Sequence, residues 1–330
     1  MINVRLALIT AIRRVNPKLT IVDVHTEHPI VDVHPIHCSV NKFQPQHSQQ
    51  MQRINLHTDE KTRYCSHWQN NASTFLDQGC YEWMAEQLTP HSPKRVLDIG
   101  CGTGEGILAL LAAGVETIVA FEENFDCIKE TEEKLISRGH AVNVVPRIGY
   151  DEGADGRHDL IIDQDSSIEE TATITLVHAD ILLHQVDVPL AAFLKSTEPF
   201  DAVTIWLMGT YDMRRTCRAL DPLNLVDHKD YRLRVQNLAY EIADEVLEAG
   251  GVFQAVDRGL MPDTENLRSM AFKMHEEQAS VTSLKVSDFA YRSYTEPTER
   301  GVSMTGLVTE NPSLVDDGRR AMHSMISFKQ

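Results

Sequence analysis

Apolar residues along this chain follow two patterns, short continuous runs and longer stretches with helical spacing. The continuous runs are typical of buried strands and cover residues 95–99, 116–122, 172–177, 200–208 and 252–256. Between several of them lie helix-forming segments, at 107–113, about 125–138 and about 230–248. Strands that alternate with helices in this way predict an α/β fold.

Three helical segments have a predicted buried side. In the segment 125–138 that side carries Cys127, Ile128, Thr131 and Leu135. In the segment 230–248 it carries Leu233, Leu238, Ile242 and Val246, and Ala249-Gly250-Gly251 closes this helix before the next strand. A further helix, predicted from about Ser73 to Leu88, repeats an apolar residue at every fourth position: Leu76, Cys80, Met84 and Leu88.

An insertion at residues 141–171 separates the helix predicted at about 125–138 from the third strand. Val142–Tyr150 and His158–Asp163 alternate enough to form a hairpin, with Asp151–Gly156 as its acidic tip. The hairpin is either a homodimer contact or a decoration, and the sequence leaves both open. Further β-like runs follow near the C-terminus at 287–294, 302–308 and 322–328.

The most informative stretch is Val96-Leu-Asp-Ile-Gly-Cys-Gly-Thr-Gly-Glu-Gly106, in which a strand runs into alternate glycines and then into a helix. Glycines at such a turn let a small ligand approach bare backbone at a helix N-terminus. A dinucleotide site wants another glycine three residues after Gly102, where this chain has Glu105, whose charge disfavours a pyrophosphate. S-adenosylmethionine suits the site better, because Asp98 attracts its ammonium group and the loop N–H groups can donate to its carboxylate.

The segment Val96–Gly104 closely resembles the first motif of the class I S-adenosylmethionine-dependent methyltransferases. The resemblance extends over roughly residues 70–328. It implies a Rossmann-like, doubly wound, mostly parallel seven-stranded sheet that ends in an antiparallel hairpin. Two of the three C-terminal runs would supply that hairpin, and the sequence does not decide which two.

The resemblance also implies a set of cofactor-binding residues. Glu122, at the end of the second strand, is assigned to the ribose hydroxyls, with Glu123 as the alternative. Asp180 matches the acid that contacts the adenine amino group, but a helix N-cap explains it equally well. The implied set is Asp98, Gly100, Cys101, Gly102, Gly104, Glu122, Glu123, Asp180, Ile181 and Trp206.

The resemblance further implies that the methyl acceptor lies beside the end of the fourth strand, Trp206–Tyr211, under a lid formed by the segment before the first strand. The candidates for the substrate pocket are Tyr64, Trp68, Tyr81, Met208 and Arg214. A general base is needed for a hydroxyl or a protonated amine and is optional otherwise. Tyr211 is the first candidate for this catalytic role, with His67, His178 and His228 as alternatives.

Several acceptor classes are disfavoured. The fourth strand ends in Trp-Leu-Met-Gly, not in the Asn/Asp-Pro-Pro-Tyr/Phe of enzymes that methylate base amino groups, and it carries no Pro-Cys for cytosine carbon. The formal charge of −17 repels nucleic acids. We therefore expect a small-molecule methyltransferase. The alternatives are a protein or RNA acceptor, and a non-catalytic protein that binds the cofactor for regulation or assembly.

The first 60 residues differ from the rest, and we divide the chain into 1–60 and a methyltransferase domain at 61–330. Ile21–His28 is repeated almost at once as Ile30–His37. The repeat brings together His25, His28, His34, His37 and Cys38. Zinc could bind such residues, but their spacing fits no zinc motif, so we expect a loosely ordered or strand-like extension without a metal. Residues 40–60, rich in Gln, Asn and His, predict a flexible linker.

The sequence also bears on the compartment. No apolar run is long enough to cross a membrane, and the apolar start lacks a convincing cleavage site. The 6 cysteines are scattered without a Cys-x-x-Cys pair. These features predict a cytoplasmic protein with reduced thiols.

Overall fold

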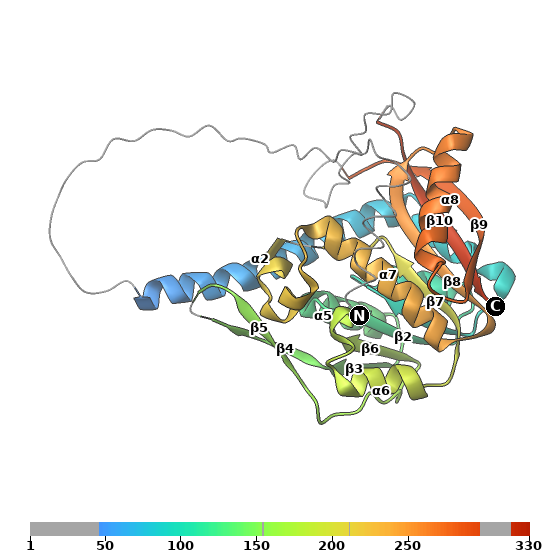
Figure 1. Cartoon of the computed structure of the whole chain (residues 1–330). Coiled ribbons are helices and arrows are strands. Elements are labelled where there is room, and N and C mark those ends of the chain that lie inside the picture. The colour runs from blue at the N-terminus through green and yellow to red at the C-terminus, as the bar shows by residue number, and fades with distance from the viewer. Residues whose placement is uncertain (1–45, 154, 211, 298–317) are drawn as a thin grey trace, which may run out of the picture.

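A computed structural model describes residues 46–153, 155–210, 212–297 and 318–330 (Figure 1). Its main element is an eight-stranded sheet with the order β3-β6-β2-β1-β7-β8-β10-β9. The strands are β1 Arg95–Ile99, β2 Thr117–Glu122, β3 Val142–Pro146, β6 Ile174–His178, β7 Phe200–Trp206, β8 Leu247–Leu260, β9 Leu284–Tyr294 and β10 Arg320–Lys329. In this sheet β3, β6, β2, β1, β7 and β8 are parallel to one another, and β10 runs antiparallel to both of its neighbours, β8 and β9.

Helices cover both faces of this sheet, and each face has its own apolar core. One core packs against α2 Gln46–Asp77, α3 Cys80–Glu86, α4 Glu105–Ala112 and α5 Phe125–Ser137. The other packs against α6 Val188–Ser196, α7 His228–Val246 and α8 Glu265–Ala279 (Figure 1). Short 3-10 turns are η1 Thr89–His91, η2 Ile181–Leu183, η3 Asp212–Thr216 and η4 Arg218–Leu223. The predicted Rossmann-like α/β fold is confirmed.

The number of strands and the C-terminal hairpin refine that prediction. The sheet has eight strands rather than seven, because β3, from the insertion, adds to its edge beside β6. The hairpin is built by β9 and β10, which contain the predicted runs 287–294 and 322–328. The third run, 302–308, lies outside the described residues.

Two predicted helical details are wrong. The helix expected over 73–88 is two helices, because Gly79 adopts a left-handed conformation (φ 66°) that ends the first one. Leu76 therefore lies off the stripe of Cys80, Met84 and Leu88 and is 44% exposed. On α7 the prediction is also wrong for Leu233, whose side chain is 42% exposed, whereas the other residues of the predicted stripe are buried.

The glycine pair after α7 does not form a separate turn. Gly250 and Gly251 lie within the long β8, which begins directly after the helix at Leu247. Gly250 has a positive φ of 82°, and the pairing with β7 shifts register nearby, so the pair forms an irregularity in the strand.

The insertion at 141–171 is only partly the predicted hairpin. Val142–Tyr150 is two strands rather than one, since β3 ends at Pro146 and β4 Ile148–Glu152 starts two residues later. β4 pairs antiparallel with β5 His158–Ile162 in a separate two-stranded sheet. Figure 1 shows this hairpin beside the part of α2 that projects beyond the main sheet.

A buried ion pair anchors this hairpin to the domain. The guanidinium of Arg147, which is 1% exposed, bonds the two carboxylate oxygens of Asp187 at 2.5 and 3.3 Å. It also donates to the carbonyl oxygens of Asp163 and Ser166. Asp187 in turn caps α6 by accepting the N–H of Leu190 at 3.1 Å.

We expect Arg147→Met to lower the free energy of unfolding by about 3–5 kcal/mol, because it leaves a buried carboxylate without its partner. Arg218→Met is the matched control. Arg218 ties the same hairpin down through the partly exposed Asp155 and Asp159, so its loss should lower the free energy of unfolding much less than the loss of Arg147 does. Urea denaturation measures both values, and equal losses in the two variants would contradict this difference.

The N-terminal predictions have different outcomes. Residues 46–60 belong to the long helix α2, so the flexible linker predicted over 40–60 is wrong for that part. The histidine repeat lies outside the described residues. Over the part that is described, no helix is long and apolar enough to cross a membrane. The cysteines described there, Cys65, Cys80, Cys101, Cys127 and Cys217, are buried and free.

Candidate active site

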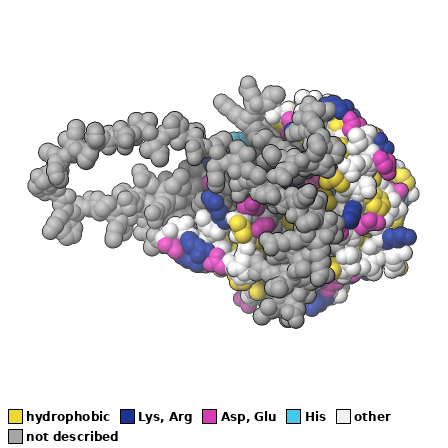
Figure 2. Space-filling view, turned by 45° about the horizontal axis from the view of Figure 1, so that its top comes forward, with side chains coloured by type: hydrophobic (Ala, Val, Ile, Leu, Met, Phe, Trp, Pro, Cys, Tyr) yellow, Lys and Arg dark blue, Asp and Glu magenta, His cyan; other side chains and the backbone are white. Residues whose placement is uncertain are grey.

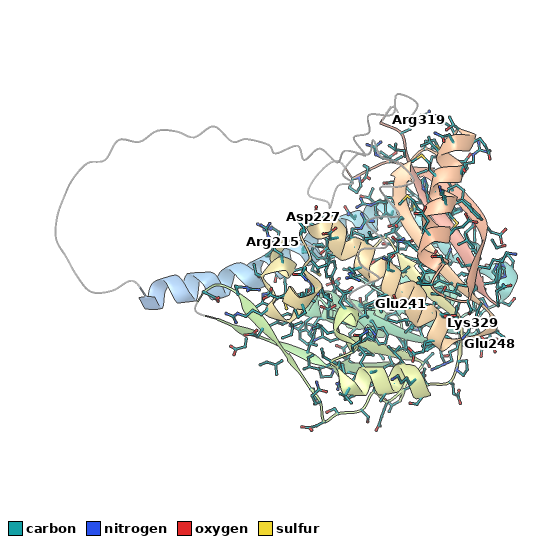
Figure 3. The ribbon with its side chains drawn as sticks, in the orientation of Figure 1. Arg215, Asp227, Glu241, Glu248, Arg319 and Lys329 are labelled. Carbon is teal, nitrogen blue, oxygen red and sulfur yellow. The ribbon has the colours of Figure 1, made fainter. Side chains whose placement is uncertain are left out.

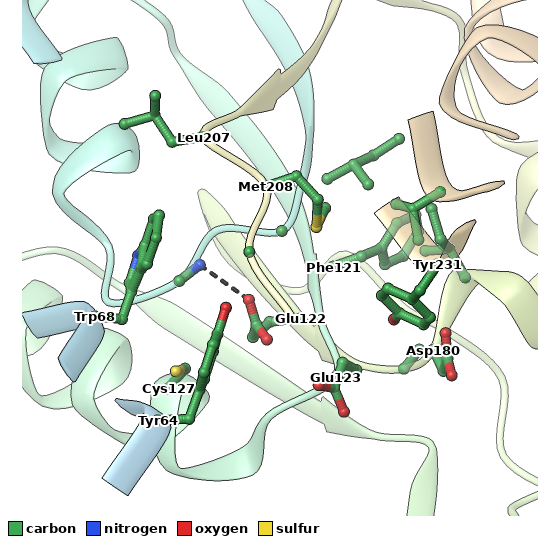
Figure 4. A pocket seen from close by; sticks show the side chains of 17 residues that line it. Tyr64, Trp68, Phe121, Glu122, Glu123, Cys127, Asp180, Leu207, Met208 and Tyr231 are labelled. Atoms are coloured by element: carbon green, nitrogen blue, oxygen red, sulfur yellow. Dashed lines mark hydrogen bonds between the residues drawn. The ribbon is translucent and has the colours of Figure 1, made fainter. Parts of the chain in front are cut away.

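A cleft opens where the carboxyl ends of β1, β2, β6 and β7 meet α2, α5 and α7 (Figure 4). It encloses about 590 Å³, part of which is open to solvent. Its walls are formed by Tyr64, Trp68, Ile99, Gly100, Gly102, Phe121, Glu122, Glu123, Cys127, Ala179, Asp180, Ile181, Leu207, Met208, Gly209, Tyr231 and Val235. Ligands of open α/β sheets bind at this kind of edge.

The glycine loop forms the floor of the cleft. Gly100, Gly102 and Gly104 have φ values of 81°, 54° and 89°, which are left-handed conformations that favour glycine. A Cβ atom on Gly102 would lie 2.5 Å from Nε1 of Trp68, and one on Gly100 would lie 2.8 Å from Cε of Met208. The loop therefore presents bare backbone closely covered by two side chains.

Gly104 serves the helix rather than the cleft. It is the N-cap of α4, and a Cβ atom there would meet Thr131 at 2.9 Å. The next residue, Glu105, forms an ion pair with Lys134 of α5 and does not line the cleft. The predicted repulsion of a pyrophosphate by Glu105 is thus weaker than expected, and the acids that line the cleft are Glu122, Glu123 and Asp180.

Glu122 joins β2 to the glycine loop. Its carboxylate accepts the N–H of Gly102 at 3.0 Å and the N–H of Asn124 at 2.9 Å. Burial, together with the charge of Glu123, raises the pKa of Glu122 to about 7. Figure 4 shows this carboxylate in the middle of the cleft, between the aromatic rings of α2 and the residues of α7.

Asp98 lies beneath the loop. Its side chain is 2% exposed and is not among the residues that line the cleft. The hydroxyl of Thr204 on β7 donates to its carboxylate at 2.7 Å. Burial raises the pKa of Asp98 to about 6, and the bond from Thr204 opposes that rise.

Arg214 holds together two acids at the far end of the cleft. It pairs with Glu123 at 3.0 Å, with Asp180, and with the hydroxyl of Tyr231 at 3.1 Å. Arg214 itself is buried behind these residues and does not line the cleft as predicted for the substrate pocket. Asp180 is the N-cap that was predicted, since its side chain accepts the N–H of Leu182 at the start of η2 at 3.1 Å. It also lines the cleft, and its contact with adenine stays a prediction.

The predicted aromatic residues separate into two groups. Tyr64 and Trp68 of α2 lie over the glycine loop and line the cleft (Figure 4). Tyr81 instead belongs to the core between α3 and the sheet. Trp206 lies in that same core, where its indole N–H donates to Gln254 at 2.9 Å, because alternation along β7 turns it toward α4. Cys101 is buried in this core too and does not line the cleft.

The candidate bases occupy different positions. Tyr211 and the side chain of His228 lie outside the described residues. His178 does not line the cleft, and burial lowers its pKa to about 4, so its ring is neutral. His67 does not line the cleft either. Within the described part of the chain, no group of His, Cys, Asp and Glu is arranged to hold a metal ion.

Several residues of the cleft were not predicted from the sequence. Tyr231 and Val235 come from α7, and Cys127 comes from α5. Leu207 lies in the segment Trp206–Tyr211 that was predicted beside the acceptor, but its positive φ of 55°, uncommon for a residue other than glycine, was not predicted. The helical spacing of Tyr231 and Val235 could have placed them on one side of α7, but not against the cleft.

Comparisons with known proteins agree with this architecture. Residues 69–182 match the family model of the methyltransferase small domain. The tRNA U34 carboxymethyltransferases of Shewanella sp. strains ANA-3 and MR-4 are 32% identical over 77 residues, which is 22% of this chain. The chain thus matches about a quarter of the length of these relatives (23%).

Solved structures are more distantly similar. The O-methyltransferase TomG from Streptomyces achromogenes is 11% identical, with a TM-score of 0.38 over 76% of this chain and 79% of its own. TrmN from Thermus thermophilus is 10% identical, with a TM-score of 0.39 over 76% of this chain and 48% of its own.

The glycine loop and the strand order have the Rossmann-like arrangement expected from the sequence, and residues 69–182 match the methyltransferase small domain.

Proposed function

We propose that this protein transfers a methyl group from S-adenosylmethionine to a small molecule. The observation that carries the proposal is the cleft floor, where the bare backbone of Gly100 and Gly102 lies beside the carboxylate of Glu122. Backbone N–H groups at a helix N-terminus suit the cofactor's carboxylate, and an acid at the end of the second strand suits its ribose hydroxyls.

The remaining described residues fit the same cofactor. Asp180 and Ile181 line the end of the cleft where the adenine ring would lie. Asp98 lies below the loop and contributes negative charge toward the ammonium group. Each oxygen of Glu122 accepts one N–H group, which leaves lone pairs for the two hydroxyls.

When bound, the cofactor supplies a methyl group on an activated sulfonium. The chain has to hold the acceptor in line with that methyl group and exclude water. Tyr64 and Trp68 of α2 perform the second task, because Trp68 covers Gly102 of the loop and Tyr64 lies against Gly209 on the other side of the cleft. Burial raises the pKa of Tyr64 well above its usual value, so its hydroxyl stays protonated and acts as a donor rather than a base. Tyr211 remains our candidate for the base.

The charge distribution favours a small acceptor. The formal charge is −17, and Figure 2 shows acidic and basic side chains interspersed over the described part of one face rather than a basic tract. The names of the tRNA-modifying relatives support RNA as a second candidate. We further propose a cytoplasmic protein, supported by its free cysteines, and a homodimer that uses the β4–β5 hairpin.

Transfer of tritium from methyl-labelled S-adenosylmethionine tests the acceptor class. We expect label in the small-molecule fraction of a metabolite extract, and none with the Glu122→Ala variant. Label that enters only an RNA or protein fraction would replace the small molecule as the acceptor. Cofactor binding without transfer to any fraction would favour a regulatory or assembly role.

A further inference from the structure

A second, smaller cavity adjoins the cleft. It is lined by Ile205, Met208, Arg232, Gln236 and Asp257 and encloses about 210 Å³, part of it open to solvent. Ile205 and Met208 lie at and just after the carboxyl end of β7, and Asp257 lies in the second half of β8. The small cavity therefore lies at the same edge of the sheet as the cleft. Met208 lines both spaces.

The first turns of α7 form a wall between the two spaces. Tyr231 and Val235 line the cleft, whereas Arg232 and Gln236, each one residue further along, line the small cavity. Both pairs have a spacing of four, so each pair lies on one face of the helix and the two faces are adjacent. Figure 3 places Asp227, just before α7, at one end of this helix and Glu248, just after it, at the other.

Met208 is the movable part of the partition. Its Cε lies 2.8 Å from the position of a Cβ atom on Gly100, so it occupies space directly over the glycine loop. Figure 4 shows it near the centre of the cleft. Methionine has three rotatable side-chain bonds and adapts to its surroundings. A ligand on the loop would displace it and join the two spaces.

The polar groups of the small cavity leave one donor unused. Arg232 pairs with Asp257 at 2.8 Å, and the amide of Gln236 donates to the other oxygen of Asp257 at 2.9 Å. The oxygen of Gln236 accepts from Gln278 at 3.2 Å. Nε of Arg232 is buried, and no described residue accepts from it. A ligand oxygen is the group that would satisfy this donor.

Resting on the proposed methyl transfer, we infer that the small cavity is a subsite for the methyl acceptor and that it binds a carboxylate on that acceptor. A guanidinium bonds a carboxylate more strongly than a neutral oxygen, because both partners are charged. The apolar side of the cavity, Ile205 and Met208, faces the carbon skeleton. The cavity has room only for the head group, so the rest of the molecule extends past Met208 toward the methyl position.

The negative net charge does not oppose this assignment. Exposed charges beyond about 8 Å are largely screened at physiological salt, so the local field is that of the Arg232–Asp257 pair, in which the guanidinium offsets the carboxylate. The side chain of Arg232 is 42% exposed, and a small anion can therefore reach it from solution.

The test uses full-length protein saturated with S-adenosylhomocysteine and labelled with ¹³C at the methionine methyl groups. Benzoate and benzamide are titrated as matched probes, and the Met208 resonance is assigned with the Met208→Leu variant. We expect benzoate to shift this resonance with at least about tenfold higher affinity than benzamide. Arg232→Gln should remove that preference. Arg234→Gln, on the exposed side of the same helix, should retain it.

The outcomes separate this inference from the proposed function. Calorimetry with S-adenosylhomocysteine first shows that each variant is folded and binds the cofactor product. If the wild-type protein does not bind it, the proposed function fails, and this inference fails with it. If it binds but benzoate leaves Met208 unmoved, or if benzoate affinity is unchanged in Arg232→Gln, only the carboxylate subsite is overturned. Equal affinities for benzoate and benzamide overturn it as well.

Discussion

Replacing Glu122 with glutamine is expected to weaken S-adenosylmethionine binding by about 1.5–3 kcal/mol, the usual contribution of hydrogen bonds to a charged group. The substitution keeps the shape of the side chain but removes its charge and one acceptor oxygen. In the free protein that oxygen is bonded to Gly102 or Asn124, so the variant also loosens the loop. Glu116→Gln is the matched control, because Glu116 is exposed and directly precedes β2, at the end of that strand opposite to Glu122.

The same variant should flatten the pH dependence of binding. The pKa of Glu122 is raised to about 7 in the free protein, and the ionised form is the one that accepts both hydroxyls. Cofactor affinity should therefore fall as the pH is lowered from 8 to 6. The sign is opposite for stability. A carboxyl whose pKa rises on folding stabilises the free protein at low pH, and this contribution is lost as the pH rises through about 7.

Isothermal titration calorimetry at several pH values measures both effects. Asp98, with a pKa of about 6, titrates in the same range, so the comparison is the difference between wild type and Glu122→Gln at each pH. Profiles of the same shape and the same affinity in both proteins would contradict the role of Glu122.

The second large effect is expected from Gly102→Ala, which should weaken cofactor binding at least about tenfold. Gly102 has a φ of 54°, and its added Cβ atom would lie 2.5 Å from Nε1 of Trp68. The left-handed conformation costs an alanine roughly 1–2 kcal/mol. The larger consequence is that Trp68 must leave its place over the loop, which opens the covered side of the cleft to water.

Gly114→Ala separates strain from collision. Gly114 also has a positive φ, of 97°, but a Cβ atom there would meet nothing within 4 Å. This control should lose a similar amount of stability to backbone strain while it keeps the wild-type affinity. Calorimetry and thermal unfolding give the two quantities. Wild-type affinity in Gly102→Ala would show that Trp68 does not need its observed position.

The sequence predicted the centre of the fold because that part is locally encoded. The continuous apolar runs placed β1, β2 and β7 nearly at their observed bounds. The spacing of the glycines located the loop, and the acid after the second run located Glu122 in the cleft. These residues lie close in sequence, and a strand, a turn and a helix in succession leave few arrangements.

The errors arose where packing between distant segments decides the outcome. Trp206 was predicted at the cofactor, but alternation along β7 turns it to the opposite core, where Gln254 holds its indole. Tyr231 and Val235 were missed because only the crossover from β7 brings α7 beside the loop. β3 was taken as part of a hairpin because nothing local shows that a strand will add to a sheet edge.

The most direct test of the central claim is a calorimetric titration of the wild-type protein with S-adenosylmethionine. The claim is that the bare loop at Gly100 and Gly102, together with Glu122, forms the cofactor site. We predict saturable binding of one cofactor molecule per chain, weakened in both Glu122→Gln and Gly102→Ala and retained in Glu116→Gln and Gly114→Ala. A folded protein that shows no binding, or equal affinity in all four variants, would contradict it.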